Sequence, residues 1–126
     1  MSKLIYCATP SRLSHKTDEI MEFVRQQNNA PLHPFKALPF NYFEGSPTIG
    51  REKTIEWCLR LLEIADEFAL CGVSHGTLQE LIHAQKKAKP IKLYLKEFDP
   101  DWNTQYNFLG DTYGRPLDAL LKQREV

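Results

Sequence analysis

The sequence has no excess of charge of either sign, because sixteen Lys and Arg residues balance sixteen Asp and Glu residues among its 126 positions. A protein that binds nucleic acid or an anionic membrane through its overall electrostatic field carries a surplus of basic residues. The balance excludes that general mode of binding and leaves open a local anion pocket. We therefore expect no nucleic-acid partner, and a ligand must be recognised by a few neighbouring side chains.

Long apolar segments and patterned cysteines are also missing. No apolar run approaches the roughly 18–20 residues that a membrane-spanning helix needs, so we expect no membrane partner. Cys7, Cys58 and Cys71 each lie inside an apolar stretch, without CxxC spacing, a secretory leader or the Cys/His pairs of a zinc site. These features predict a cytoplasmic protein without a metal or another cofactor, in which the three cysteines are small buried hydrophobes.

Strand-like and helix-like segments alternate along the chain, in the order β-α-β-α-β-α-β. This alternation predicts a single domain over residues 1–126, with a three-layer, Rossmann/flavodoxin-like α/β fold. The sheet should be parallel, with four to five strands and helices on both faces. The predicted strands and helices, in chain order, are residues 3–9, 15–27, the vicinity of Leu32, 51–67, 68–73, 77–89 and 90–96.

Local signals suggest where these elements begin and end. Ser14 is a plausible N-cap of the first helix and Asn28-Asn29 a plausible stop. Four prolines and four aromatics in residues 30–50 favour an edge strand followed by an irregular excursion rather than a helix. The tail, residues 97–126, should add one or two short helices, the last from about Pro116 to Arg124.

A ligand site in such a fold lies beyond the carboxyl ends of the strands, where loops and helix N-termini gather. Three segments should converge there: the end of the first strand with the loop after it, the start of the helix at residues 51–58, and the Ser74–Thr77 turn. A helix N-terminus offers unpaired N–H groups and a positive dipole end, so the turn could accept a phosphate or carboxylate. The first segment carries Tyr6, Thr9, Ser11 and Arg12.

Each of these signals also has a structural interpretation. Thr77-Leu78-Gln79-Glu80 fits a capping box in which Glu80 reaches back to the helix start. Ser74-His75-Gly76 can be a turn in which glycine relieves strain, with His75 a solvated loop residue. Arg12 can be a surface cation, and Tyr6 a core aromatic. The residues alone leave both interpretations open.

Together these positions resemble the nucleoside 2-deoxyribosyltransferase-like superfamily, and most closely its branch of nucleoside 5'-monophosphate N-glycosidases. The resemblance spans roughly residues 3–95. It is carried by Tyr6 with Arg12 six positions later, by Ala65-Asp66 before an apolar strand, and by S-x-G-x-x-x-E with an alanine four residues on. The last motif comprises Ser74, Gly76, Glu80 and Ala84.

The resemblance implies a role for each matching residue. Glu80 would be the nucleophile that attacks C1' of the sugar, and Tyr6 would help to position it. Ser74 and Arg12 would hold the 5'-phosphate, next to His75, Gly76 and Thr77 of the same turn. The family has an aspartate eight residues before that of the Ala-Asp pair, whereas this sequence has Cys58 there, and we count Cys58 among the expected substrate-binding residues.

Three functions follow as hypotheses. The first is an enzyme that hydrolyses or transfers the N-glycosidic bond of a small nucleotide, with aromatic residues of 35–43 stacking the base. The second, suggested by Cys58, is a catalytically silent nucleotide-binding module that acts as a sensor, scavenger or regulatory protein. The third is a structural protein in which the Thr77–Glu80 box only caps a helix. By resemblance, we also expect a homodimer or a larger homo-oligomer.

Overall fold

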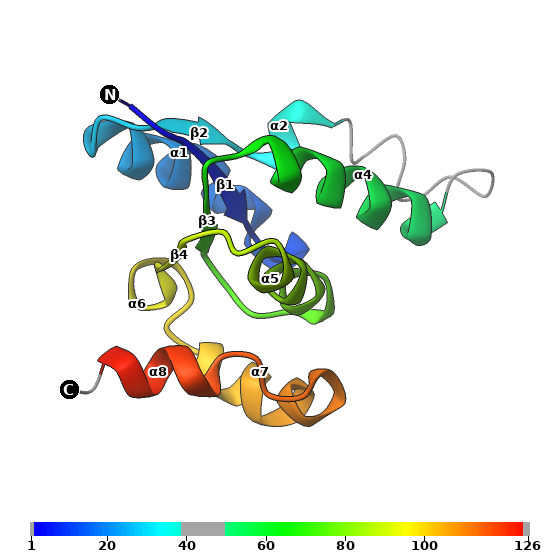
Figure 1. Ribbon diagram of the computed structural model, residues 1–126. Helices are drawn as coiled ribbons and strands as arrows, with labels where there is room; N and C mark the ends of the chain where they lie inside the picture. The colour runs from blue at the N-terminus through cyan, green and yellow to red at the C-terminus, as the bar shows by residue number, and fades with distance from the viewer. Residues whose placement is uncertain (1, 39–49, 125–126) are drawn as a thin grey trace.

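The computed structural model describes residues 2–38 and 50–124 (Figure 1). Its strands form one parallel sheet of four strands in the order β2-β1-β3-β4, which confirms the predicted three-layer α/β fold. In chain order the elements are β1 (Leu4–Ala8), η1 (Ser11–Lys16), α1 (Thr17–Gln26), β2 (Ala30–Leu32), α2 (Pro34–Ala37), α4 (Gly50–Ile64), β3 (Glu67–Leu70), α5 (His75–Lys86), β4 (Ile91–Leu93), α6 (Leu95–Phe98), α7 (Trp102–Leu109), η2 (Gly110–Tyr113) and α8 (Asp118–Arg124).

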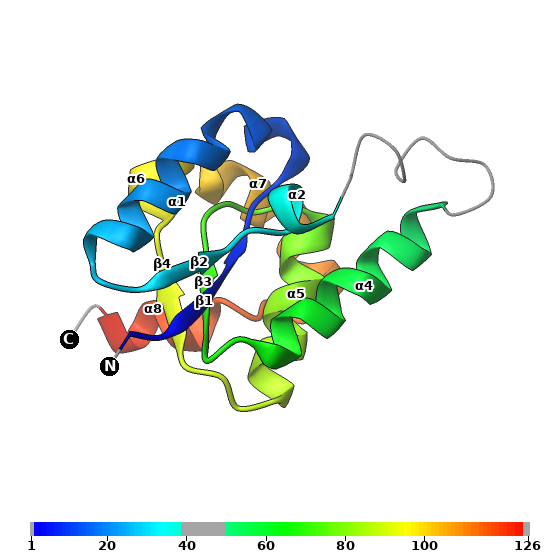
Figure 2. The ribbon, with the colours of Figure 1, turned by 90° about the horizontal axis from the view of Figure 1, so that it is seen from above.

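The two central strands are apolar on both faces, because helices cover both sides of the sheet. Ile5 and Cys7 of β1 belong to one buried cluster with residues of α1 and α6. Tyr6 and Ala8 of the same strand belong to the other cluster, with residues of α4, α5 and the tail. Figure 2 shows α1 and α6 on one side of the strands and α4 and α5 on the other. The period of two along β1 thus divides the core into two layers.

The first helix begins later than the sequence signals predict. Residues Ser11–Lys16 form a 3-10 turn, and the N-cap of α1 is Lys16, which makes no side-chain capping bond. Ser14 is therefore not the N-cap, and its carbonyl instead accepts the Thr17 hydroxyl at 2.6 Å. The predicted stop is confirmed, since the helix ends before Asn28, which adopts a left-handed φ of 64°.

The segment after β2 also differs from the prediction of an irregular excursion. Pro34–Ala37 forms the short helix α2, in which the proline occupies the first position and needs no N–H partner. The imidazole of His33 caps this helix by accepting the N–H of Phe35 at 3.2 Å. The rest of the predicted excursion, residues 39–49, lies outside the described residues.

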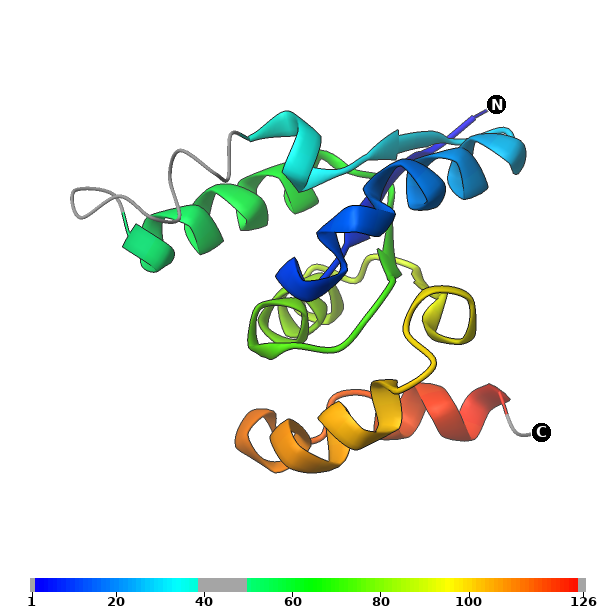
Figure 3. The same cartoon turned by 180° about the vertical axis from the view of Figure 1, so that it is seen from behind.

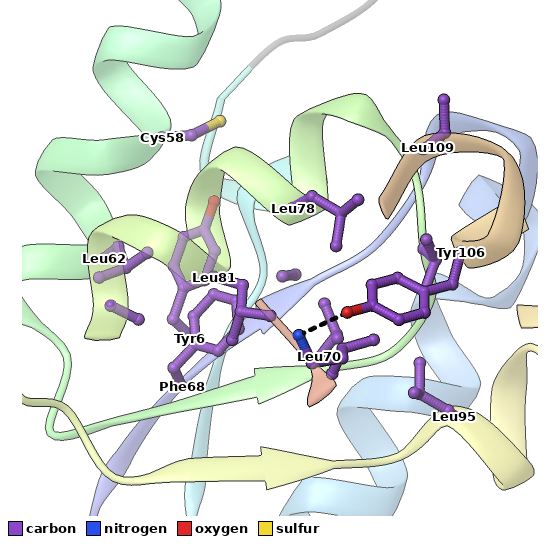
Figure 4. Packing of buried hydrophobic residues seen from close by; sticks show 14 of the residues in the cluster. Tyr6, Cys58, Leu62, Phe68, Leu70, Leu78, Leu81, Leu95, Tyr106 and Leu109 are labelled. Carbon is purple, nitrogen blue, oxygen red and sulfur yellow. Dashed lines mark hydrogen bonds between the residues drawn. The ribbon is translucent and has the colours of Figure 1, made fainter. Parts of the chain in front are cut away.

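The tail packs beyond α5, at the side of the sheet that carries β4 (Figures 1 and 3). The predicted final helix is confirmed as α8, and α6, α7 and η2 precede it. Tyr106 anchors this region because its buried hydroxyl donates to Asp118 at 2.8 Å and accepts the N–H of Leu117 at 3.0 Å. Figure 4 draws the second of these bonds beside Leu95 and Leu78. The buried residues of the tail thus belong to the same cluster as the residues of α4 and α5.

Ion pairs hold the amino ends of the strands. Glu67 opens β3 with 6% of its surface exposed and binds Lys3 at 2.8 Å and Lys92 at 3.5 Å. The hydrogen bond from Lys3 is the main reason why the pKa of Glu67 lies below its usual value. Asp66 accepts the N–H of Leu4 at 2.8 Å. Asp66 therefore lies at the end of the sheet opposite the predicted site.

Candidate active site at the carboxyl end of the sheet

A cleft opens beyond the carboxyl ends of β1 and β3, where the chain leaves these two neighbouring strands in opposite directions. This position is the topological switch point of the sheet, where α/β proteins bind their ligands. The empty space is about 410 Å3, counting its mouth open to solvent. Its lining residues are Thr9, Ser11, Pro34, Phe35, Thr54, Ile55, Cys58, Ser74, Gly76, Thr77 and Glu80.

Glu80 lies in the second turn of α5 and is buried, with 6% of its surface exposed. It does not form the capping box that its spacing from Thr77 allows. The box closes one turn earlier: the Ser74 hydroxyl accepts the N–H of Thr77 at 3.2 Å, and Thr77 Oγ1 accepts the N–H of Ser74 at 2.8 Å. The capping interpretation of Glu80 is therefore wrong, and its carboxylate faces the cleft.

Tyr6, on the central strand β1, binds the Glu80 carboxylate. Its ring is fully buried in β1 and stacks on Phe68 with the centroids 5.9 Å apart, and its hydroxyl donates a hydrogen bond to Glu80 Oε2. Burial, followed by the charge of Glu80 and by Cys58, raises the pKa of Tyr6 well above 10. The phenol therefore stays protonated and acts as a permanent donor to the carboxylate.

Cys58 faces the same hydroxyl from α4. Its side chain lines the cleft and is 4% exposed, and its interaction with Tyr6 contributes to the raised pKa of that phenol. Figure 4 shows the hydroxyl of Tyr6 directed toward the helix that carries Cys58. The predicted position 58 thus belongs to the site, with a thiol in the place where the resemblance leads us to expect a carboxylate.

The turn before α5 forms one wall of the cleft with Ser74, Gly76 and Thr77. Thr77 is committed to the local fold, because its buried hydroxyl also donates to the carbonyl of Gly72 at 2.8 Å. Gly72 is required here: a Cβ at this position would lie 2.7 Å from the ring of Pro10. The close packing brings the loop after β1 against the turn that starts α5.

Arg12, predicted to bind phosphate, makes its strongest contacts within the protein. Its guanidinium donates to both carboxylate oxygens of Asp99, at 3.1 and 2.8 Å, and to the carbonyl of Val73 at 2.7 Å. Asp99, only 2% exposed, also accepts the N–H of Val73 at 3.0 Å. Arg12 is not among the lining residues of the cleft. Arg12, which follows Ser11, thus links the loop after β1 to Val73, which precedes Ser74, and to Asp99 in the tail.

His75 also lies outside the cleft lining. Its side chain is exposed, and its Nδ1 lies 2.7 Å from the hydroxyl of Tyr113 in the tail. The two rings meet edge to face with centroids 5.7 Å apart. The interpretation of His75 as a solvated residue is closer to this arrangement than a role inside the cleft.

A second buried polar pair, which the sequence did not reveal, joins His33 to Thr9, one of the lining residues of the cleft. His33, 1% exposed, lies 3.0 Å from Thr9 Oγ1 through its Nε2. Because Nδ1 accepts the N–H of Phe35, Nε2 carries the proton and donates to Thr9, whose hydroxyl passes its own hydrogen bond to the carbonyl of Cys7. Burial, then the charge of Lys36, lowers the pKa of His33 to about 4, so the ring is neutral at pH 7.

Of the eight residues predicted for the site, the structure gathers six around the cleft and places Arg12 and His75 beside it. The six are Tyr6, Cys58, Ser74, Gly76, Thr77 and Glu80. Phe35 lines the cleft, whereas residues 39–43 of the predicted aromatic stack lie outside the described residues. Within residues 2–38 and 50–124, no group of His, Cys, Asp and Glu side chains is arranged to hold a metal ion.

Comparisons with protein-family models, with curated proteins and with solved structures found no match. In the part of the chain that the structure describes, no helix has both the length and the apolar character to cross a membrane.

Proposed function

We propose that this protein hydrolyses or transfers the N-glycosidic bond of a nucleoside 5'-monophosphate or a related small nucleotide, with Glu80 as the nucleophile. The observation that carries the proposal is the buried Glu80 carboxylate, held by the Tyr6 hydroxyl at the switch point of the sheet. Perturbed titratable groups in a cleft are typical of catalytic sites. The resemblance noted in the sequence assigns these two residues the same roles.

The chemistry requires a carboxylate under the anomeric carbon. Cleavage of an N-glycosidic bond passes through an oxocarbenium-like state, which a carboxylate stabilises or captures as a glycosyl ester. Glu80 approaches the cleft from the first turns of α5, and Tyr6 fixes the direction of its oxygens. Water or a second base would then release the sugar from Glu80.

The start of α5 is the part of the cleft best suited to a phosphate. The Ser74 hydroxyl and the backbone N–H groups of the first helical turn lie at the positive end of the helix dipole. The hydroxyls of Thr9 and Ser11 line the same cleft from the loop after β1. In this proposal Arg12 acts mainly by fixing that loop and the turn through Asp99.

The test is to incubate the purified protein with ribo- and deoxyribonucleoside 5'-monophosphates and to follow free base by chromatography. Base release by the wild type, abolished in Glu80→Ala, is the expected result. If no nucleotide loses its base while several still bind, the enzymatic proposal is wrong.

A catalytically silent nucleotide-binding module is the second candidate, and Cys58 favours it. The resembling family has an aspartate at this position, and a thiol does not supply the ionised carboxylate of that aspartate. Under this alternative, nucleotides raise the melting temperature by mass action without releasing base, and Glu80→Gln binds as tightly as the wild type. Turnover of any nucleotide would exclude it.

The remaining expectations are also proposals. A cytoplasmic protein that forms a homodimer or a larger homo-oligomer fits the resemblance, with the partners limited to small nucleotides. Light scattering of the purified chain measures the oligomeric state directly.

A further inference from the structure

The polar groups around the cleft are poorly suited to protonate a departing base. An ordinary purine or pyrimidine must gain a proton as it leaves, and general acid catalysis contributes about 100-fold or more to such steps. Glu80 is the only carboxylate among the described residues that line the cleft, and as a nucleophile it cannot serve as the acid at the same time. Among the described residues that line the cleft or bond to its lining, the remaining possible proton donors are Tyr6, Cys58 and His33.

Each of these groups holds its proton for another reason. Tyr6 uses its proton to bind Glu80, and its pKa lies well above 10. His33 donates its Nε2 proton to Thr9 and has a pKa of about 4, so no second proton is available at pH 7. Loss of the Cys58 proton would leave a buried thiolate facing the same hydroxyl as the Glu80 carboxylate, and low-dielectric surroundings penalise two like charges.

A base that already carries a positive charge does not need the proton. When the bond between C1' and a quaternary ring nitrogen breaks, its electron pair moves to the nitrogen and the ring leaves as a neutral molecule. The cleft also has features that attract such a ring: the Glu80 carboxylate and the aromatic side chain of Phe35, with Ile55 and Cys58 as uncharged neighbours. The same features that hinder an ordinary base favour a cationic one.

We propose that the preferred substrates are 5'-monophosphates with a quaternary, pyridinium-type base, in which C1' is bonded to the charged ring nitrogen. This inference rests on the proposed function and deepens it. Glu80 Oε bonds to C1' as the bond to nitrogen breaks, and water then displaces Glu80 from C1'. The products are the neutral pyridine, the sugar 5-phosphate and one proton, which goes to solvent, so charge and atoms balance.

The decisive experiment compares two nearly isosteric probes on the wild-type protein. Nicotinamide mononucleotide has the charged ring, and its dihydro form has nearly the same shape without the charge. We expect kcat/KM for base release to be at least about 100-fold higher for the charged probe than for adenosine or uridine 5'-monophosphate, because these bases need a general acid and the described lining of the cleft offers none. We expect no release from the dihydro form.

Position 58 provides the second arm. Cys58→Asp should raise base release from the neutral-base nucleotides and so reduce the preference, whereas Cys58→Ser, an uncharged and nearly isosteric control, should retain it. The probe comparison needs only the wild type, so it remains decisive if Cys58→Asp fails to fold.

Two results would overturn the inference, and they differ in what else they overturn. Release from adenosine or uridine 5'-monophosphate at a rate equal to or above that from the pyridinium probe removes the substrate preference and leaves the proposed function intact. Release from none of the nucleotides removes both.

Discussion

Two glutamates at opposite ends of the sheet are buried to the same degree, with 6% of the surface of each exposed, and have different surroundings. Glu67, at the amino ends of the strands, is bound by Lys3 and Lys92. Glu80, at the carboxyl ends, is bound by the neutral hydroxyl of Tyr6 and faces a cleft. Burial alone therefore does not distinguish a carboxylate held in ion pairs from one that faces a cleft.

The difference lies in what the neighbours do to the charge. Two lysines balance the negative charge of Glu67. Lys3 lies just before β1, and Lys92 lies in β4. A phenol that stays protonated orients Glu80 without cancelling its charge, so the carboxylate remains able to respond to positive charge that develops on a sugar. The carboxylate at the amino end is held by two ammonium groups, whereas the carboxylate at the carboxyl end is held by a neutral hydroxyl and faces the cleft.

The largest expected effect comes from removing the charge at each end in turn. Glu80→Gln should lower kcat/KM for base release by about 1,000-fold or more, because it removes the proposed nucleophile. Glu67→Gln, the matched control, should leave activity unchanged and lower the free energy of unfolding by about 1 kcal/mol, since its lysine partners are partly exposed. Equal losses of activity in the two variants would contradict the comparison.

The pH dependence of stability tests the carboxyl end through His33. Its pKa is about 4 in the folded protein and about 6.5 when unfolded, so only the unfolded state binds the proton between these values. Stability should therefore fall as the pH is lowered from 6.5 to 4, by on the order of 3 kcal/mol from this group. Denaturant melts of the wild type and His33→Gln measure the difference, and carboxylates titrate in both.

If the wild type and His33→Gln lose the same stability on acidification, His33 is not the neutral cap of α2 that its bonds to Phe35 and Thr9 indicate. The comparison at pH 7 serves as the reference, since the histidine is neutral there in the folded state and mostly neutral in the unfolded state.

The interaction of Asp99 with Arg12, at the carboxyl end of the sheet, should contribute less to the free energy of unfolding. Asp99→Asn removes the charge that holds Arg12, and we expect the free energy of unfolding to fall by about 2 kcal/mol, as for a hydrogen bond to a charged group. Asp111→Asn is a suitable control, because Asp111 binds Arg115 at 3.3 Å on the surface with an 85% exposed side chain. A double-mutant cycle with Arg12→Met should recover most of the loss as coupling energy.

The smallest effect is a gain at the amino end. Ala88 follows α5 with a left-handed φ of 56°, a conformation that glycine adopts without the steric cost of a Cβ. Ala88→Gly should raise the free energy of unfolding by about 0.5–1 kcal/mol. Gln79→Gly, at an exposed position inside α5, should instead lower it by about 1 kcal/mol. Thermal melts of both variants distinguish a backbone effect at position 88 from a general response to glycine.

Periodicity was enough to predict the sheet, because β1 and β3 are apolar on both faces and the helices between them are amphipathic. The partners of individual side chains were not predictable in the same way. The Glu80 carboxylate has two possible sets of hydrogen-bond donors. One is the start of its own helix, and the other is Tyr6, on a strand 74 residues earlier in the chain. Ser74 supplies a shorter and better placed cap, so Tyr6 takes the carboxylate.

Long separations hid the other differences as well. Arg12 finds Asp99 87 residues later, and a carboxylate after a short helix gives no sequence signal of that pairing. His33, between a strand and a proline, has the appearance of a loop residue in the sequence. His33 is buried where it caps α2, and the prolines of this segment led us to expect no helix there. For Glu80 and Arg12 a distant partner decided the outcome, whereas for His33 the adjacent helix α2 acted together with Thr9, 24 residues earlier.

The cap at Ser74 and Thr77 has an evolutionary consequence. Because this box closes without Glu80, the start of α5 does not depend on the residue at position 80. A descendant with glutamine there would retain the helix, the cleft and the turn while it loses the proposed nucleophile. Under the proposed function, one substitution therefore separates an enzyme from a silent binding protein, and the rest of the domain need not be rebuilt between them.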